Sequence, residues 1–322
     1  MTSAGVLSSL PYIQAIHNAS AAAGGISRSE GSNVDVFVNP DTGVETALCH
    51  LSVIAPYISR GFNLDPLEDA AVMSLAAHHL NTGDGSIISQ VQGLNERCNV
   101  RFTVETNNAG YSPKESIELV VTQDSRPVGG TQGEGPIPCA FIGPYGSRPS
   151  VSTGIITGIY GYPMITSGAT TLTLDDKSSY PLTGRTTVSD LGKAMPIILY
   201  FRDVLQLEHL VVINVNTENG NAFANSLRAV AEEIAPQLKI RQIPYDQANG
   251  SIEAVVEGVR DSKYRFIIAL IYGGSTQDAF MEEAYRQGVA GNGKHNWMFA
   301  DGFQNLEGRE IGTDSILYKA YQ

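Results

Sequence analysis

The chain has 322 residues, of which 42% are hydrophobic, and this is enough apolar material for a globular protein of two domains. Its 33 acidic and 21 basic side chains give a formal net charge of −12. Nucleic acids and anionic lipid surfaces attract clustered Lys and Arg, so this balance argues against both as partners. No run of about 18 apolar residues occurs, so we expect no membrane span within this chain.

Small and polar residues dominate the start of the chain. The stretch Ala21–Asn33 is rich in Ala, Gly and Ser, a composition typical of linkers and mobile arms. We therefore expect residues 1–45 to form an N-terminal arm outside the main fold.

From residue 46 onward, predicted strands alternate with predicted helices. Asp65-Pro66-Leu67-Glu68 opens the first helix with an N-cap, a first-turn proline and an acidic residue, and this helix ends near Gly83. Ser112-Pro113-Lys114-Glu115 repeats the same pattern before a second helix. The strands that we predict are Cys49–Pro56, Val100–Val104, Ala140–Gly143, Met164–Thr166, Leu210–Val215, Ile240–Ile243, Phe266–Ile271 and Trp297–Ala300. The remaining helices are Arg148–Tyr160, Leu191–Leu205 with a kink at Pro196, Ala222–Ala235, Ser251–Val259 and a helix from Ser275 to Gly288.

This alternation is typical of βαβ units, so the predicted fold class is α/β, with parallel sheets flanked by helices on both faces. In such sheets a ligand binds beyond the carboxyl ends of the strands.

Several motifs add a more specific expectation. The blocks that carry it are Phe141-Ile-Gly-Pro-Tyr-Gly-Ser147, Tyr162-Pro-Met-Ile-Thr-Ser-Gly-Ala-Thr170, Leu174-Asp-Asp-Lys-Ser-Ser-Tyr-Pro-Leu-Thr-Gly-Arg-Thr-Thr-Val-Ser-Asp190 and Phe299-Ala-Asp-Gly302. In order and spacing, over roughly residues 46–303, they resemble the receptor-family ligand-binding region. Class C G-protein-coupled receptors, natriuretic peptide receptors and bacterial Leu/Ile/Val-binding proteins share this region.

The resemblance implies a two-lobed fold of the type-1 periplasmic binding proteins, each lobe a parallel sheet flanked by helices, with a ligand closing the cleft between the lobes. Lobe 1 would take residues 46–165 and lobe 2 residues 166–300. Residues 301–322 would begin a return to lobe 1, which would leave that lobe incomplete, as in a fragment of a longer receptor. The resemblance also implies a homo- or heterodimer formed through lobe 1.

The candidate ligand-binding residues of lobe 1 are Ser147 and Gly168-Ala169-Thr170. Ser147 begins a helix, where free N–H groups and the helix dipole favour an anion, and the matching serine of amino-acid-binding relatives holds the ligand carboxylate. The alternative is an N-cap that serves only its own helix. Gly168-Ala169-Thr170 resembles the turn that contacts the amino and carboxyl groups of bound amino acids, or else a turn that simply requires small residues.

In lobe 2, the resemblance brings Asp190 and Asp301 to the cleft, where two carboxylates would suit an ammonium group. Asp190 could instead cap its helix, and Asp301 could stabilise the turn that follows it. In glutamate-type receptors an aromatic residue follows the strand that matches Leu210–Val215. Here Ala222 stands at or next to that position, and we expect the adjacent Phe223 to substitute for the aromatic residue.

Motifs for catalysis, cofactors and metals are weak. Gly288–Lys294 has the spacing of a phosphate loop, but His295 stands where Ser or Thr must bind Mg²⁺. His78 and His79 diverge by about 100° on a helix, so they cannot share one metal ion. We therefore predict that the protein is not an enzyme and uses no cofactor or metal.

Cys49, Cys98 and Cys139 stand at the amino ends of the first three strands, which a parallel order of 2-1-3 makes neighbours. Such strands lie about 5 Å apart, so Cys49 could pair with Cys98 or with Cys139. The alternative is three buried thiols in a cytosolic protein. Asn18-Ala-Ser20 and Asn249-Gly-Ser251 match the N-glycosylation pattern. We predict a location on the extracellular side of the plasma membrane, or in the periplasm if the source is bacterial.

The leading hypothesis is the ligand-binding domain of a membrane receptor that senses a small molecule, such as an amino acid or a derivative, by cleft closure. Only segments outside this chain would contact the membrane. The alternative is a soluble solute-binding protein of an ABC-type amino-acid transporter. A third hypothesis is a domain without a ligand that mediates receptor assembly. A transmembrane segment or a kinase or cyclase domain in the full-length gene would distinguish the first from the second.

Overall fold

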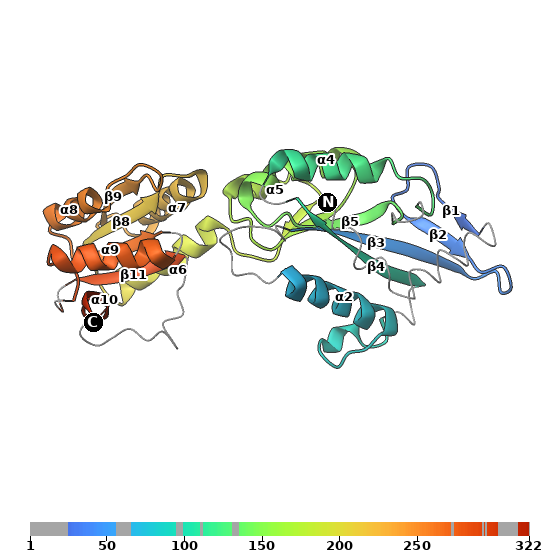
Figure 1. The fold of residues 1–322 in the computed structure, drawn as a ribbon, viewed down its shortest axis with the longest axis horizontal. Helices are drawn as coiled ribbons and strands as arrows, with labels where there is room; N and C mark the ends of the chain where they lie inside the picture. The colour runs from blue at the N-terminus through green and yellow to red at the C-terminus, as the bar shows by residue number, and fades with distance from the viewer. Residues whose placement is uncertain are drawn as a thin grey trace. The chain divides into compact units, whose positions relative to one another are not determined.

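The computed structural model describes residues 25–55, 66–94, 99–109, 112–130, 135–271, 274–291, 293, 295–301 and 315–321. The chain divides into two compact units, unit 1 (Met1–Thr187) and unit 2 (Val188–Gln322). Each unit contains a sheet flanked by helices, so the predicted α/β class is confirmed (Figure 1). Within the described residues, no helix has the length and apolar composition that crossing a bilayer requires.

Unit 1 has a seven-stranded sheet in the order β1-β2-β3-β5-β6-β7, with β4 paired to β3 outside this path. The strands are β1 (Ile26–Ser27), β2 (Asp35–Val38), β3 (Glu45–Ala55), β4 (Val100–Asn108), β5 (Pro138–Ile142), β6 (Met164–Thr166) and β7 (Thr183–Arg185). The β1–β2 and β2–β3 pairs are antiparallel, and the other pairs are parallel. Because β3 pairs with both β4 and β5, the expected 2-1-3 order is confirmed.

Helices cover both faces of this sheet: α4 and α5 lie on one face and α2 on the other (Figure 1). The helices are α2 (Pro66–Thr82), α4 (Pro113–Asp124) and α5 (Ser147–Tyr160). Unit 1 also contains two short 3₁₀ helices, η1 (Ser89–Val91) and η2 (Leu172–Asp175). Ser112 caps α4 as predicted, because its side chain accepts a hydrogen bond from Glu115 N. Val120 of α4 packs with Phe141 of β5 and Met164 of β6 in a buried core.

Unit 2 has a parallel four-stranded sheet in the order β11-β10-β8-β9. Its strands are β8 (His209–Val215), β9 (Lys239–Tyr245), β10 (Phe266–Leu270) and β11 (Asn296–Asp301), and its helices are α6 (Asp190–Asp203), α7 (Glu218–Ile234), α8 (Ile252–Ser262), α9 (Gly274–Arg286) and α10 (Ile316–Ala320). Alternate residues of β8 face opposite sides of the sheet. Leu210 and Val212 pack with α6 and α7, whereas Val211 and Ile213 pack with α8 and α9. Both faces are therefore buried, which explains the apolar run Leu210–Ile213 in β8.

The boundaries of lobe 1 differ from the prediction at both ends. Residues 25–38 were expected in an arm, but β1 and β2 extend the sheet, and the Asp35 carboxylate is buried against Arg28 at 2.6 Å. Unit 1 also continues to Thr187 rather than ending at residue 165, because β7 pairs with β6.

The expected return of the C-terminal residues to lobe 1 is wrong for the described part of that segment. Helix α10 packs against α9, and its residue Ala320 is buried in the core of unit 2. The Tyr321 hydroxyl donates a hydrogen bond to Asp278 of α9 at 3.2 Å. Apolar burial within unit 2 therefore fixes this segment.

Candidate functional site

Two loops follow β5 and β6 and leave the sheet at the same edge. The two strands are parallel, with Phe141 opposite Met164 and Ile142 opposite Ile165. The loop after β5 leads into α5 through Tyr145–Ser147, and the loop after β6 contains Gly168–Thr171. We call these two segments the β5–β6 loop pair. It lies at the carboxyl ends of parallel strands, where ligands bind in open α/β sheets.

Ser147 joins the two loops. Its Oγ accepts hydrogen bonds from the backbone N–H of Thr170 at 3.1 Å and of Thr171 at 3.3 Å. The N-cap of α5 is Gly146, without any side-chain cap, so the alternative N-cap role for Ser147 is wrong. Both bonds use the serine oxygen as acceptor, and the hydroxyl hydrogen can therefore be donated to another group.

Buried hydrogen bonds fix the loop pair further. The Pro144 carbonyl accepts from Thr166 Oγ1 at 2.7 Å and from Ser150 Oγ at 2.8 Å, and both of these side chains are fully buried. On the other loop, the Arg185 guanidinium of β7 donates to the Thr171 carbonyl at 2.8 Å and pairs with Asp175. Side chains of α5, β6 and β7 therefore hold the backbone of the loop pair in place.

Two glycines allow the loops to approach the rest of unit 1. Gly143 has φ +97°, and a Cβ at this position would lie 2.0 Å from the Ile54 carbonyl oxygen. A Cβ on Gly168 would lie 2.6 Å from the Tyr145 carbonyl oxygen. Ala169 is fully buried beside Tyr180. Close packing thus explains the small residues of the Gly168-Ala169-Thr170 turn, while Thr170 stays half-buried at the edge.

The unit 2 candidates lie on three different elements. Asp190 is the first residue of α6 and is buried, but the cap is Ser189, whose Oγ accepts from Gly192 N at 3.1 Å. Asp301 ends β11 opposite Leu270, and its side chain lies outside the described part of the structure. Phe223 is buried in the core between α7 and β8, so packing accounts for it and its ligand role stays a prediction.

A network of side-chain amides was not predicted. Asn214 is fully buried near the end of β8, accepts from Gln242 Nε2 at 2.8 Å and donates to Asn221 Oδ1 at 2.8 Å. Asn221 in turn donates to Asn216 Oδ1 at 3.0 Å. This chain of amides fixes the loop at the carboxyl end of β8. The interruption of the apolar run Leu210–Val215 by Asn214 could have indicated it.

A partly buried charged cluster in unit 1 was also missed. Glu105 accepts from Arg126 Nη1 at 2.6 Å and from Nη2 at 2.9 Å, and His50 Nε2 lies 3.0 Å from Glu105 Oε2. Burial alone would raise the pKa of Glu105, but the hydrogen bonds from His50 and Arg126 outweigh it and lower the pKa to about 2. Thr103 Oγ1 lies 2.7 Å from His50 Nδ1.

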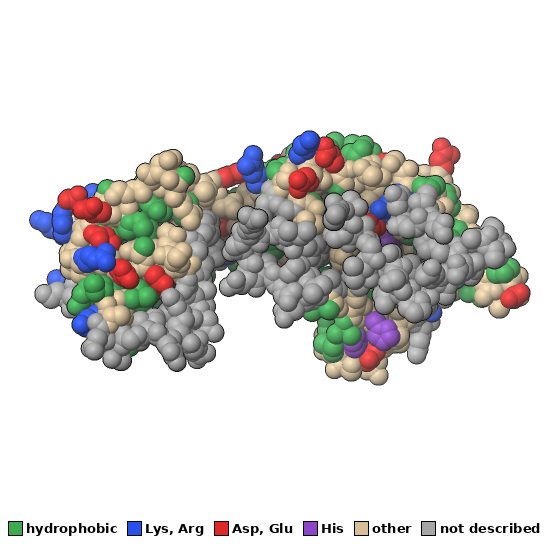
Figure 2. Space-filling model, viewed as in Figure 1, with side chains coloured by type: hydrophobic (Ala, Val, Ile, Leu, Met, Phe, Trp, Pro, Cys, Tyr) green, Lys and Arg blue, Asp and Glu red, His purple; other side chains and the backbone are tan. Residues whose placement is uncertain are grey.

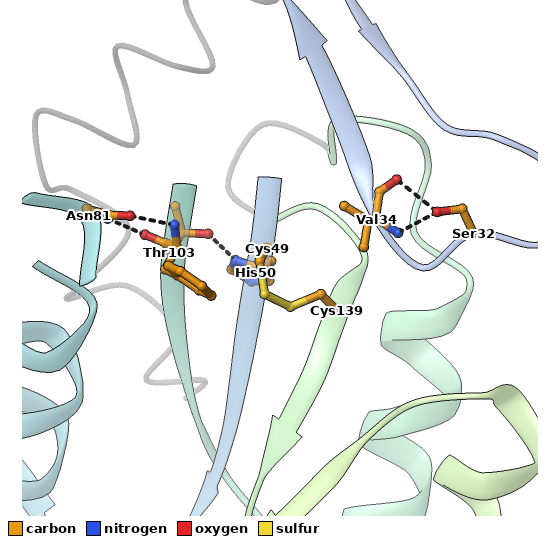
Figure 3. The surroundings of a disulfide bond; sticks show 8 residues. Ser32, Val34, Cys49, His50, Asn81, Thr103 and Cys139 are labelled. Carbon is orange, nitrogen blue, oxygen red and sulfur yellow. Dashed lines mark hydrogen bonds between the residues drawn. A yellow bond between two sulfur atoms is a disulfide. The ribbon is translucent and has the colours of Figure 1, made fainter. Parts of the chain in front are cut away.

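The disulfide lies next to His50 of this cluster (Figure 3). Cys49 pairs with Cys139 at a Cα–Cα distance of 5.1 Å, which confirms one of the two predicted pairings, and Cys98 lies outside the described residues. Cys49 is not at the amino end of its strand as expected, because β3 already begins at Glu45. Cys139 sits where the β3–β5 register shifts.

Charged side chains and one of the two glycosylation patterns lie on the surface of unit 2. Figure 2 shows basic and acidic side chains next to one another over α8 and α9, where Arg260 pairs with Glu257 and Arg286 with Glu282. Asn249 is exposed in a turn after β9, and Asn18 lies outside the described residues.

Across the part of the chain that the structure describes, no cluster of three or more His, Cys, Asp or Glu side chains could hold a metal ion.

The family model of the receptor family ligand binding region matches residues 88–316. This chain belongs to that family. No curated protein matches the chain. The receptor-family domain is similar to an ABC transporter substrate-binding protein from Desulfitobacterium hafniense, with a TM-score of 0.57 and 17% identity over 78% of this chain and 66% of that one. It is also similar to a leucine-binding protein from Thermotoga maritima, with a TM-score of 0.56 and 12% identity over 79% of this chain and 64% of that one.

These likenesses establish the fold of the receptor-family domain as that of the type-1 periplasmic binding proteins, which the motifs predicted. The chain spans less than two thirds of the length of either solved structure. The family and the structural neighbours are binding proteins and ligand-binding regions. The receptor-family domain is therefore a ligand-binding domain.

Proposed function

We propose that the receptor-family domain binds a small molecule with an amino and a carboxylate group, as amino acids have, and serves as the extracellular sensor of a membrane receptor. The observation that carries the proposal is the β5–β6 loop pair with Ser147 at its centre. Ser147 Oγ already accepts two backbone N–H groups, so the geometry of its hydroxyl is fixed before a ligand arrives. Such pre-organisation reduces the entropy cost of binding.

The loop pair suits a carboxylate for two reasons. The Ser147 hydroxyl can donate to a carboxylate oxygen, and hydrogen bonds to an ionised acceptor are stronger than neutral ones. The 14-residue helix α5 begins at this serine, and its positive end favours the same charge.

The other end of the ligand is assigned to unit 2. Asp190 and Asp301 would accept hydrogen bonds from the ammonium group, as the motifs of the family suggest. The family resemblance implies cleft closure, and a zwitterion would favour the closed state in proportion to its differential affinity for that state. In a receptor, closure would alter the packing of a dimer formed through unit 1, and no catalytic step is involved.

The receptor role is supported by the disulfide between Cys49 and Cys139, which suits an oxidising compartment, and by the exposed Asn249 of a glycosylation pattern. A second candidate is a solute-binding protein for an ABC-type transporter, favoured by the structural likeness to the substrate-binding protein of Desulfitobacterium hafniense. A transmembrane segment in the full-length gene would support the receptor, and a neighbouring transporter operon would support the second candidate.

The test is a thermal-shift screen of the chain against amino acids, sugars and nucleosides, followed by calorimetry. We expect an amino acid to raise the melting temperature of the wild-type chain and to bind Ser147→Ala more weakly. Ser152→Ala is the matched control, because Ser152 lies on the same helix and its Oγ bonds only the Pro149 carbonyl among described groups, at 3.1 Å. A sugar or nucleoside that binds the wild type and Ser147→Ala equally would contradict the proposal.

A further inference from the structure

Tyr145 has an unusual place in the β5–β6 loop pair. Its side chain is 38% exposed at the carboxyl edge of the sheet, although it packs tightly on the neighbouring loop. A Cβ on Gly168 would lie 2.8 Å from Cε2 and Cζ of the Tyr145 ring, closer than real Cβ contacts. Gly168 is therefore the residue that makes room for this ring, and any larger residue would displace it.

Hydrogen bonds hold the chain in place before and after Tyr145. Before Tyr145, the Pro144 carbonyl is held by Thr166 and Ser150. After it, Ser147 binds the backbone of Thr170. A tyrosine loses little side-chain entropy when its loop is already fixed, since only two side-chain dihedrals remain. The backbone that carries the ring is thus fixed on both sides.

The ring and the Ser147 hydroxyl both belong to the β5–β6 loop pair. Tyr145 precedes Ser147 by two residues, and their contacts Gly168 and Thr170 are also two residues apart. A ligand whose carboxylate binds at Ser147 would bring the group on its next carbon toward the ring. An exposed aromatic ring favours apolar and flat groups, which lose contact with water when they stack on it.

We propose that Tyr145 is a specificity-determining residue, whose ring, seated on Gly168, receives an apolar or aromatic side chain of the bound amino acid. This inference rests on the proposed function, because the ring matters only if the ligand carboxylate binds at the loop pair. It adds the substrate class: amino acids with large apolar side chains bind more tightly than glycine.

The first experiment is calorimetry of glycine, alanine, leucine and phenylalanine with the wild-type chain, Tyr145→Phe and Tyr145→Ala. We expect Tyr145→Ala to lose about tenfold in affinity for leucine and phenylalanine, the size of an aromatic contact. Its affinity for glycine should stay within about twofold of wild type. Tyr145→Phe keeps the ring and should keep the order of affinities.

Gly168→Ala tests the same idea without removing the tyrosine. The added methyl group collides with the Tyr145 ring and carbonyl, so we expect a larger loss of affinity for leucine and phenylalanine than for glycine. Gly158→Ala is the matched control on α5, because a Cβ there would meet no atom within 4 Å. Melting temperatures of all variants show whether each one is folded.

The outcomes separate this inference from the function on which it rests. Equal losses for glycine and phenylalanine in both Tyr145→Ala and Gly168→Ala would mean that the ring only supports the loop, and would overturn the inference. Unchanged selectivity in folded Tyr145→Ala would overturn it as well, while amino-acid binding itself stands. A wild-type chain that binds none of these four amino acids but binds another one in the thermal-shift screen would overturn the inference alone, and a chain that binds no amino acid in the screen would overturn the proposed function as well.

Discussion

Glu105 shows how a carboxylate stays ionised inside unit 1. Its side chain is 21% exposed, and it is held by Arg126 through Nη1 and Nη2 and by His50. The contacts join residues 21 and 55 positions apart in the chain, so no local pattern of the sequence could indicate them. Ser147 and Thr170, by contrast, stand in motifs that the sequence displays, and their proximity could be predicted.

The pH dependence of stability should reveal the Glu105 cluster. Its folded pKa of about 2 lies below the usual 4.5, so the cluster contributes stability that is complete above the unfolded pKa and is lost as the pH falls from about 4.5 toward 2. We expect Glu105→Gln to lose on the order of 3 kcal/mol near neutral pH and to show a flatter pH dependence in this window.

Urea denaturation at several pH values measures this effect. Glu118→Gln is the control, because Glu118 is 60% exposed and pairs only with the exposed Lys114 among described residues. If wild type and Glu105→Gln lose the same stability on acidification, the cluster does not act as described.

A substitution at Asp301 tests the proposed contact with the ammonium group of the ligand. Replacing it by Asn keeps the size of the side chain but removes the negative charge. We expect Asp301→Asn to weaken binding of an amino acid by about 2–5 kcal/mol, the usual cost of breaking a buried charged contact. Calorimetry measures the change, with Asp261→Asn on the exposed end of α8 as control. A ligand that binds Asp301→Asn as tightly as wild type would rule out this contact.

At the scale of elements, helices could be predicted where capping residues and apolar runs coincide. Ser112, Ser189 and Ser251 all accept a hydrogen bond from the first turn of their helices. Thr217 does the same for α7, which begins at Glu218 rather than at the predicted Ala222. Strands β1, β2 and β7 could not be predicted, because they have only two to four residues each, too few to show a hydrophobic period. The two residues of β1, for example, form a strand only by pairing with β2.

Thr217 provides a test of the capping contribution. Its Oγ1 accepts from Gly220 N at 3.2 Å at the start of α7. We expect Thr217→Ala to lower the free energy of unfolding of unit 2 by about 1 kcal/mol, because one backbone N–H of the helix start loses its acceptor. Thr217→Ser keeps the hydroxyl and should lose far less, as thermal denaturation can show. Equal losses in the two variants would contradict a capping role.

At the scale of the whole molecule, the motifs predicted the family and the two-unit division, but not where each unit ends. The border after Thr187 depends on the pairing of β7 with β6, and the place of α10 depends on apolar contacts with α9. Both are tertiary contacts, which the alternation of strands and helices does not encode.

The disulfide should contribute to the stability of unit 1. It links residues 90 positions apart and so restricts the unfolded chain. We expect Cys49→Ser to lower the free energy of unfolding by about 2–5 kcal/mol, and dithiothreitol to have a similar effect on the wild type. Cys98→Ser is the internal control and should retain the stability of the oxidised chain. A Cys98→Ser variant that loses as much as Cys49→Ser would contradict the assigned pairing.

The same covalent link bears on how the molecule responds to proteases. Residues 49–139 form a closed ring of polypeptide, which contains α2, β4 and α4. A single cut anywhere in this ring leaves both pieces covalently attached, so the cleaved molecule keeps one mass on a gel without reductant and separates into two fragments with it. A cut outside the ring releases its fragment under either condition. Limited proteolysis on paired gels would therefore assign each accessible site to the inside or the outside of the ring.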